Sequence, residues 1–280
     1  MTTAIVNKII PFSSVDGPGN RTAIFLQGCN INCVYCHNPE TRGMCINCGD
    51  CVKTCPAGAL SVEKGKVAWN RDLCCQCDAC IHTCMHDSSP RTRVMTPEQV
   101  YEEVKKQVPF IRGISVSGGE CTLQPQFLEE LFTLAKADGL GTLIDSNGTV
   151  DFEQFPGFCE VTDGVMLDIK AFDEEQCKKV TGYTNQVVLK NAAWLAARGK
   201  LEEVRCVIAP DLYDTESSVR SVGEFLQDKV QKETFVIKLI AFRPMGVREA
   251  FKSLQVPSNQ YMEKLKKILE DMGYQKIILI

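Results

Sequence analysis

The sequence contains no long hydrophobic run. No stretch of its 280 residues reaches the roughly 18 consecutive apolar residues that a membrane span requires. Residues 1–14, where a secretion signal would stand, are interrupted by Lys8 and Pro11 and lack an apolar centre. We therefore expect a cytoplasmic protein that has no membrane partner.

Basic charge is also scarce. The chain has 31 Lys and Arg against 35 Asp and Glu, which gives a formal net charge of -4. Affinity for nucleic acid depends largely on basic side chains that neutralise phosphates, and the short segment Arg91-Thr-Arg93 is too small to supply them. Nucleic acid is therefore not an expected partner.

Cysteine, in contrast, is abundant, with 16 residues. Because the cytosol keeps thiols reduced, cysteines in a chain without a secretion signal are typical of metal or cluster ligands rather than of disulfides. Eleven of them lie in closely spaced groups between Cys29 and Cys84. The other five have no regular spacing and are expected to be ordinary buried or half-buried residues: Cys75, Cys121, Cys159, Cys177 and Cys206.

The first group is a C-x3-C-x2-C loop formed by Cys29, Cys33 and Cys36, directly after an expected strand at residues 22–27. Soft thiolate ligands suit an iron-sulfur cubane or zinc. Three protein ligands would leave one iron open, just as catalytic zinc sites keep a free position. A zinc site completed by His37 is the alternative, although zinc patterns usually pair cysteines with a distant second pair.

Two later segments repeat the spacing C-x2-C-x2-C-x3-C. In bacterial ferredoxins with this spacing, the fourth cysteine of each run ligates the other cluster. The predicted ligand sets are therefore Cys45, Cys48, Cys51 and Cys84 for one cubane, and Cys74, Cys77, Cys80 and Cys55 for the other. Pro56 follows Cys55 as in ferredoxins, whereas Met85 stands where a second proline would be. Two zinc knuckles are the alternative, but zinc binding does not demand two matching runs.

We expect residues 38–92 to form a small module that is held by its clusters, because its apolar patch at residues 59–62 is too small to be a core. Outside this module, strand-like and helix-like segments alternate. The expected strands are residues 4–10, 22–27, 114–117, 142–145, 165–170, 204–209, 235–242 and 276–280. Thr96 begins one expected helix, and Gly139, Gly199 and Gly273 mark the ends of three others. This alternation predicts a mostly parallel sheet or barrel, built from residues 1–37 and 93–280, that binds ligands at the carboxyl ends of its strands.

Three short motifs follow these strands. In Ser117-Gly-Gly-Glu120, paired glycines would let the backbone approach a ligand, and the carboxylate could accept hydrogen bonds from an ammonium group; a tight turn is the alternative. Asp145-Ser-Asn-Gly148 would ordinarily indicate a hairpin, but the strand-helix alternation argues against one. In Asp168-Ile-Lys170, a ligand role and a solvated lysine are both open.

Together these residues resemble the radical S-adenosylmethionine (SAM) superfamily, and within it the glycyl-radical-enzyme activases related to pyruvate formate-lyase activating enzyme. The matching segments stand in the family's order at residues 15–19 with Arg21, 25–29, 35–39, 117–120, 145–148 and 166–170. Residues 8–13 and 25–38 are most similar to YjjW-type activases. The cysteine module resembles the insertion of activases that carry two additional 4Fe-4S clusters.

The resemblance implies a partial (β/α)6 radical SAM barrel with an inserted two-cluster ferredoxin-like domain, and three 4Fe-4S clusters in all. It implies that Cys29, Cys33 and Cys36 ligate the cluster whose open iron chelates SAM. The implied SAM-binding positions are Tyr35, Cys36, His37, Gly118, Gly119, Glu120, Asp168, Ile169 and Lys170. The positions that match a monovalent cation site are Asp145, Ser146, Met166 and Asp168. Arg243 departs from the family, because relatives commonly have a SAM-contacting histidine there.

The implied activity is that of a radical SAM oxidoreductase. A low-potential donor such as flavodoxin or ferredoxin reduces the cluster, and SAM is cleaved to methionine and a 5′-deoxyadenosyl radical. This radical takes a hydrogen from a glycine of a partner glycyl-radical enzyme. The alternatives are a radical SAM enzyme with auxiliary clusters that acts on a small molecule or another peptide, and an electron-transfer or binding protein without catalysis.

Overall fold

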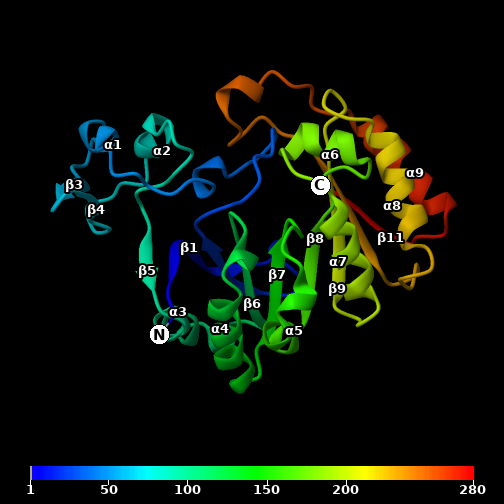
Figure 1. Cartoon of the computed structure of the whole chain (residues 1–280), viewed down its shortest axis with the longest axis horizontal. Coiled ribbons are helices and arrows are strands. Elements are labelled where there is room, and N and C mark those ends of the chain that lie inside the picture. Colours follow the sequence, from blue (N-terminus) through cyan, green and yellow to red (C-terminus); the bar gives the residue numbers. More distant parts are fainter. Residues whose placement is uncertain (1) are drawn as a thin grey trace.

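A computed structural model describes residues 2–280 as an open, mostly parallel nine-stranded sheet flanked by helices, with a small module beside one edge (Figure 1). The strand order is β11-β10-β9-β8-β7-β6-β2-β1-β5. The strands from β2 to β11 along this order run parallel, whereas β1 is antiparallel to both β2 and β5. The strands are β1 (Ala4–Ser13), β2 (Arg21–Leu26), β5 (Arg93–Met95), β6 (Gly113–Gly118), β7 (Gly141–Ser146), β8 (Gly164–Asp168), β9 (Leu201–Ile208), β10 (Val236–Ala241) and β11 (Lys276–Leu279).

Helices connect the parallel strands, as the alternation in the sequence predicted. They are α3 (Pro97–Lys105), α4 (Pro125–Ala137), α5 (Pro156–Val161), α6 (Glu174–Thr181), α7 (Gln186–Ala196), α8 (Thr215–Leu226) and α9 (Asn259–Asp271). Thr96 caps α3 in a full capping box with Gln99, and Gly139 follows α4 with a positive φ of 74°. β7 is followed by a helix and pairs in parallel with β8, so Asn147-Gly148 does not form a hairpin.

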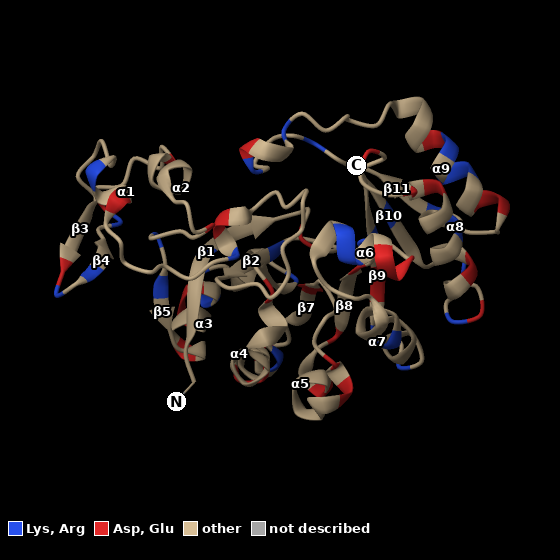
Figure 2. Ribbon diagram, turned by 45° about the horizontal axis from the view of Figure 1, so that its top comes forward, with Lys and Arg blue, Asp and Glu red and all other residues tan. Residues whose placement is uncertain are grey.

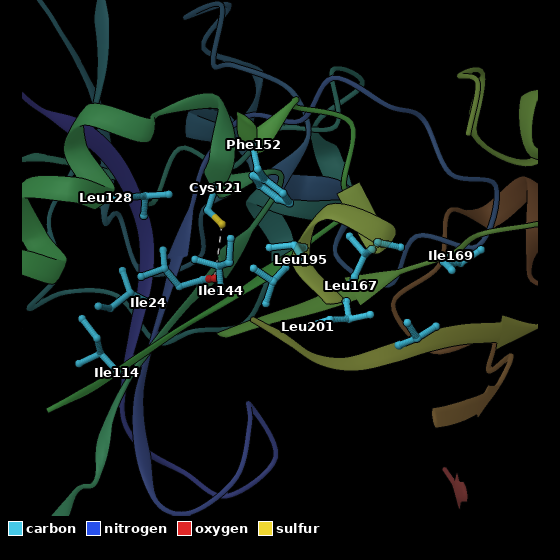
Figure 3. Close-up of a cluster of buried hydrophobic side chains, with 14 of the residues drawn as sticks. Ile24, Ile114, Cys121, Leu128, Ile144, Phe152, Leu167, Ile169, Leu195 and Leu201 are labelled. Carbon is cyan, nitrogen blue, oxygen red and sulfur yellow. Dashed lines mark hydrogen bonds between the residues drawn. The ribbon is translucent and has the colours of Figure 1, made fainter. Parts of the chain in front are cut away.

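The core lies between the sheet and the helices that cover it (Figure 3). Ile24, Ile114 and Ile144 come from adjacent strands and are fully buried, and Leu128 of α4 packs in the same cluster. β-branched residues suit such a strand surface, because their side chains pack well on a pleated sheet. The core therefore fixes the register of the parallel strands and aligns their carboxyl ends.

The opposite end of the sheet, where the parallel strands begin, is covered by the loop between β1 and β2. Arg21 is 7% exposed, and its guanidinium donates to the carbonyls of Pro18 (2.9 Å), Ile114 (3.0 Å) and Gly141 (3.3 Å). Ser115 donates its hydroxyl to the carbonyl of Asp16 in the same loop. Residues 15–19 therefore close the amino end of the strands and lie far from their carboxyl edge.

The cysteine-rich segment forms a separate small unit. It contains α1 (Asp50–Lys53), a hairpin of β3 (Leu60–Glu63) and β4 (Lys66–Trp69), and α2 (Ala79–Thr83). Its buried hydrophobic cluster consists of only Cys51, Leu60 and Cys80 among the described residues, so apolar burial alone is a weak source of stability here.

Among the five cysteines without regular spacing, Cys121, Cys159, Cys177 and Cys206 are buried, as expected. The prediction was wrong for Cys75, which is exposed because it stands in a surface loop next to Cys74. Within residues 2–280, no helix combines the length and the apolarity needed to cross a membrane.

Candidate active site

The carboxyl ends of β2, β6, β7 and β8 surround a cavity of about 230 Å³, which we call the rim cavity. The residues of its lining that the sequence had singled out are Cys29, Cys33, Tyr35, Cys36, His37, Gly118, Gly119, Asp145, Ser146, Asp168 and Lys170. Glu120, Ile169 and Met166 are nearly or fully buried and do not belong to this lining. The strand alignment thus brings most of the three strand-end motifs and the first cysteine loop into one place.

The cysteine loop is fixed from two sides by backbone hydrogen bonds. Cys29 donates its N–H to the carbonyl of Arg42 at 3.0 Å. On the other side, Asn32 donates to the carbonyl of Thr181, the last residue of α6, at 2.8 Å. These bonds satisfy polar backbone groups in a half-buried loop and hold the three thiols at the rim cavity.

Burial dominates the chemistry of the three thiols. It raises the pKa of Cys29 to about 11 and that of Cys33 to about 12. The neighbouring thiols add to the rise for Cys33, whereas the ammonium of Lys170 opposes it. Thiols in such a setting become thiolates when a cation binds them, because the bound charge replaces the lost solvation.

Two glycines bring β6 against the cysteine loop. A Cβ on Gly118, whose φ is +120°, would lie 2.2 Å from the carbonyl oxygen of Leu26, and one on Gly119 would lie 2.1 Å from that of Gly28. No side chain fits at such distances. The pair is therefore required by backbone packing, and both residues also line the rim cavity.

Glu120 binds the chain itself instead of facing the cavity. Its carboxylate accepts hydrogen bonds from the hydroxyls of Thr122 (2.6 Å) and Ser146 (2.9 Å), and from the backbone N–H groups of Thr122 (3.1 Å) and Asn147 (2.6 Å). With four donors on a side chain that is 1% exposed, this carboxylate joins the end of β6 to the end of β7.

A network of opposite charges lies beside the thiols. Arg205 of β9 donates to the carboxylate of Asp145 at 2.8 Å and to the sulfur of Met166 at 3.0 Å. Burial lowers the pKa of this guanidinium, but the carboxylates of Asp145 and Glu203 raise it by more. The predicted cation-binding positions Asp145 and Met166 thus have a cationic side chain of the chain itself as a partner.

Lys170 and Tyr35 form the wall next to Cys33. The ammonium of Lys170 lies 2.6 Å from the Asp168 carboxylate and 5.8 Å from the centre of the Tyr35 ring. Burial lowers the pKa of Lys170, yet the carboxylate of Asp168 and the thiol of Cys33 raise it by more, so the lysine remains charged. The alternative of a solvated lysine does not apply, because the side chain is 15% exposed.

His37 and Arg243 meet through the backbone of Arg243. Nε2 of His37 lies 3.1 Å from the Arg243 carbonyl oxygen, which favours a proton on that nitrogen. Burial lowers the pKa of this imidazole.

The chain is similar to known proteins over most of its length. The sequence pattern described as the radical SAM superfamily matches residues 23–222. The chain belongs to the radical SAM superfamily. The pyruvate formate-lyase-activating enzyme of Streptococcus mutans is 29% identical over 98% of this chain and 94% of its own length. The (2S)-3-sulfopropanediol sulfolyase activating enzyme of Bilophila wadsworthia is 32% identical over 81% of this chain and 82% of its own.

Solved structures show the same fold. A domain of the pyruvate-formate lyase-activating enzyme from Bacteroides vulgatus has a TM-score of 0.52 and 20% identity, over 60% of this chain and 98% of that domain. QueE from Escherichia coli has a TM-score of 0.58 and 12% identity, over 99% of this chain and 94% of its own. The predicted family and the mostly parallel α/β fold are thereby confirmed.

Radical SAM proteins use a 4Fe-4S cluster and SAM, and the rim cavity fits both. Three thiols without a fourth cysteine face it, which suits a cluster with one open iron. SAM carries a carboxylate, an ammonium and a sulfonium, and the cavity offers both signs of charge through Asp145, Asp168, Lys170 and Arg205. Within residues 2–280, no three His, Cys, Asp or Glu side chains converge closely enough to hold a single metal ion.

The radical SAM chain gathers its other spaced cysteines around two further cavities. One is lined by Cys45, Cys48, Cys51 and Cys84, and the other by Cys55, Cys74, Cys77 and Cys80 together with Cys75. Each set combines three cysteines of one run with the fourth of the other run. This is the grouping that the ferredoxin spacing predicts.

Arg205 and Asn147 also line the rim cavity; the sequence did not single out Arg205, and it included Asn147 in the motif at residues 145–148 without giving it a role. The amide of Asn147 donates to the sulfur of Cys29 at 3.7 Å and to Asn30 at 3.3 Å. A charged residue within the apolar strand 204–208 was a signal for Arg205, because a buried strand accepts an arginine only where carboxylates meet it.

Proposed function

We propose that this protein is an activating enzyme that installs a radical on a glycine of a partner glycyl-radical enzyme. The single observation that carries the proposal is the likeness to activating enzymes over nearly the whole chain, joined to three thiols beside a cavity of mixed charge. The cluster, when bound, supplies the electron that cleaves SAM to methionine and the 5′-deoxyadenosyl radical.

The residues of the rim cavity have separate roles in this proposal. Cys29, Cys33 and Cys36 hold the cluster, and the backbone of Gly118 and Gly119 lies open beside it. Lys170 and Asp168 orient the charged groups of SAM, because both are partly buried and ion-paired. Burial of the cavity walls keeps water from the reacting carbon.

Glycine suits the partner segment, because a residue without Cβ can bring its backbone close to the reacting carbon. The partner must expose that segment in order to reach the cavity. We therefore expect modest affinity that depends on the dynamics of the partner.

The test is to mix the reduced protein, SAM and a candidate glycyl-radical enzyme without oxygen and to record electron paramagnetic resonance. A glycyl doublet should appear, and a partner with alanine in place of that glycine should give none. SAM cleavage coupled to a changed small molecule, with no radical on any partner, would instead assign the protein to the alternative class of radical SAM enzymes.

We further propose that residues 38–92 form an inserted ferredoxin-like domain with two 4Fe-4S clusters. The two cavities support this, because each is lined by four spaced cysteines, which is enough to ligate all four irons of a cubane and would leave no iron for a substrate. We propose electron delivery from a low-potential donor, such as flavodoxin or ferredoxin, as the role of the module.

Variants at Cys48 and Cys77 test this role. If they retain the first cluster, they should still cleave SAM when dithionite reduces that cluster directly, while cleavage with a protein donor should fall. Failure to cleave SAM with dithionite would show that an auxiliary cluster takes part in the reaction itself.

A further inference from the structure

A second cleft, of about 360 Å³, lies between the cysteine module and the strand β1. On the sheet side it is lined by Asn7, Lys8, Ile9 and Arg93, and on the module side by Glu40, Trp69, Arg71, Cys74, Gln76, Asp78, Ile81 and Arg91. It is larger than the rim cavity and shares no residue with it. We call it the module cleft.

The charge of the module cleft is opposite to that of the chain. Four basic residues line it against the two acidic residues Glu40 and Asp78, although the whole chain has a net charge of -4. In Figure 2, β5 lies beside β1 and carries the blue colour that marks Lys and Arg. Burial raises the pKa of Glu40, whereas the nearby Arg91 and Lys8 oppose the rise.

Two of the four basic side chains lack an acidic partner. Arg91 pairs with Asp78, and Arg93 pairs with Glu103 of α3. Lys8 and Arg71 are exposed and form no ion pair within residues 2–280. They therefore offer positive charge that no direct ion pair neutralises on both walls of the cleft, one from the sheet and one from the module.

The module cleft is next to one of the two cysteine groups. Cys74, Trp69, Asp78 and Arg91 line both this cleft and the cavity of Cys55, Cys74, Cys77 and Cys80. The other group is joined to the rim instead. Cys84 of this group lies three residues before Asp87, whose carbonyl accepts a hydrogen bond from the N–H of Gly43. The carbonyl of the preceding residue, Arg42, accepts a hydrogen bond from the N–H of Cys29 in the rim cavity.

We propose that the module cleft is the docking site of an acidic electron-transfer protein, whose electron enters the chain at the group of Cys55, Cys74, Cys77 and Cys80. The inference rests on the proposed function, because it requires that the module carries clusters. One electron leaves the donor and one is gained by the chain, and no bond or proton is transferred. Complementary charge speeds such weak encounters, which use small interfaces.

A donor at the other cysteine group is less well supported. Of the exposed residues that line its cavity, Ile46 and Met85 are apolar and Asp50 is acidic, which does not complement an acidic donor. A small anion could also meet Lys8 and Arg71, and the test separates it from a protein donor.

The double variant K8E/R71E tests the docking site, and K276E/R198E is the matched control. Both control residues are exposed: Lys276 is the first residue of β11, and Arg198 follows the end of α7 in the sequence. Their replacement by Glu changes the net charge by the same amount as K8E/R71E. Both proteins, loaded with clusters, are mixed without oxygen with reduced flavodoxin, an acidic donor, and cluster bleaching is followed by stopped-flow absorbance. We expect the second-order rate constant to fall about tenfold for K8E/R71E and to lose its dependence on salt, and to change less than twofold for the control.

Iron content and the rate of reduction by dithionite should be unchanged in both variants. This result would show that the clusters of the module are intact. If K8E/R71E loses iron, K8Q/R71Q replaces it in the test. This variant removes the two positive charges without reversing them, so its rate should lie between those of wild type and K8E/R71E. Equal rates for wild type and K8E/R71E, or equal slowing by the control, would overturn the proposal. Inhibition of the wild type by 1 mM citrate at constant ionic strength, without any effect of the variant on flavodoxin, would assign the cleft to a small anion and also overturn it.

Failure of the proposed function would look different. The glycyl radical would then be absent even in wild type reduced by dithionite, whereas the stopped-flow difference between K8E/R71E and its control would persist.

Discussion

Among the described residues, Asn147 has a side chain that contacts Cys29, one of the proposed cluster ligands. Its amide donates to the sulfur of Cys29 at 3.7 Å, and hydrogen bonds to cysteine sulfur favour the reduced cluster. We expect N147L to lower the midpoint potential of the SAM-cleaving cluster by roughly 30–60 mV, equal to about 0.7–1.4 kcal/mol for one electron. Redox titration monitored by electron paramagnetic resonance measures this shift.

T149V is the control for that substitution. The hydroxyl of Thr149 donates to the side-chain oxygen of Asn147 at 2.7 Å but makes no bond to a thiol, so a smaller shift is expected. A potential unchanged in N147L, with all irons present, would mean that this hydrogen bond does not tune the cluster.

Glu120 is expected to act in stability more than in SAM binding. E120Q keeps the shape but places an amide where the carboxylate accepts from four donors, so at least one buried N–H or O–H loses its partner. We expect a loss of roughly 2–4 kcal/mol in the free energy of unfolding, measured by denaturant titration. A large rise in the SAM dissociation constant without loss of stability would contradict this assignment.

At the residue scale, the sequence predicted the thiols and the strand-end motifs but not Arg205, the cation that pairs with Asp145. Spacing placed Cys29, Cys33 and Cys36 correctly at the rim, because cluster ligands must be close in sequence when they share one loop. Arg205 reaches Asp145 from another strand, and no local pattern records such a pairing.

At the scale of elements, the loop after β10 fastens the cysteine loop. Arg248 donates to the carbonyl of Cys33 at 2.8 Å and to the side chain of Asn32, and it lies 3.5 Å from the carboxylate of Asp87, which also pairs with Arg42. One guanidinium thus joins the loop after β10, the cysteine loop and the end of the module.

We expect R248M to loosen the cysteine loop, because its charge-assisted hydrogen bonds contribute roughly 1.5–3 kcal/mol each in such positions. The half-life of the first cluster in the presence of an iron chelator should fall several-fold, measured by absorbance. R243M is the control, because Arg243 contacts His37 only through its backbone carbonyl. Equal half-lives for the two variants would show that Arg248 does not position the loop.

Local signals were enough to place most elements. The capping box at Thr96 and the left-handed Gly139, Gly199 and Gly273 marked helix boundaries correctly, because each depends on neighbouring residues only. The short helices α1 and α2 could not be predicted, since a helix of four or five residues has no periodic pattern.

At the scale of the whole molecule, eleven cysteines fall into sets of three, four and four. We expect about twelve irons per chain after reconstitution and about eight when Cys29, Cys33 and Cys36 are replaced together by Ala, with loss of all SAM cleavage. Iron analysis measures both values. Full activity with only one or two zinc ions bound would contradict the assignment. How the module lies against the sheet could not be predicted, because contacts such as that of Arg248 with Asp87 join residues far apart in the sequence.

Arg21 and residues 15–19 close the amino end of the parallel strands, and the rim cavity lies at the opposite, carboxyl end. A cofactor and a partner segment that reach the cavity from the carboxyl end would share one route. In an activating enzyme, a partner segment seated there would also block the exit of methionine and 5′-deoxyadenosine. Each visit of the partner would then deliver no more than one radical, and the partner would have to depart before the spent cofactor is exchanged.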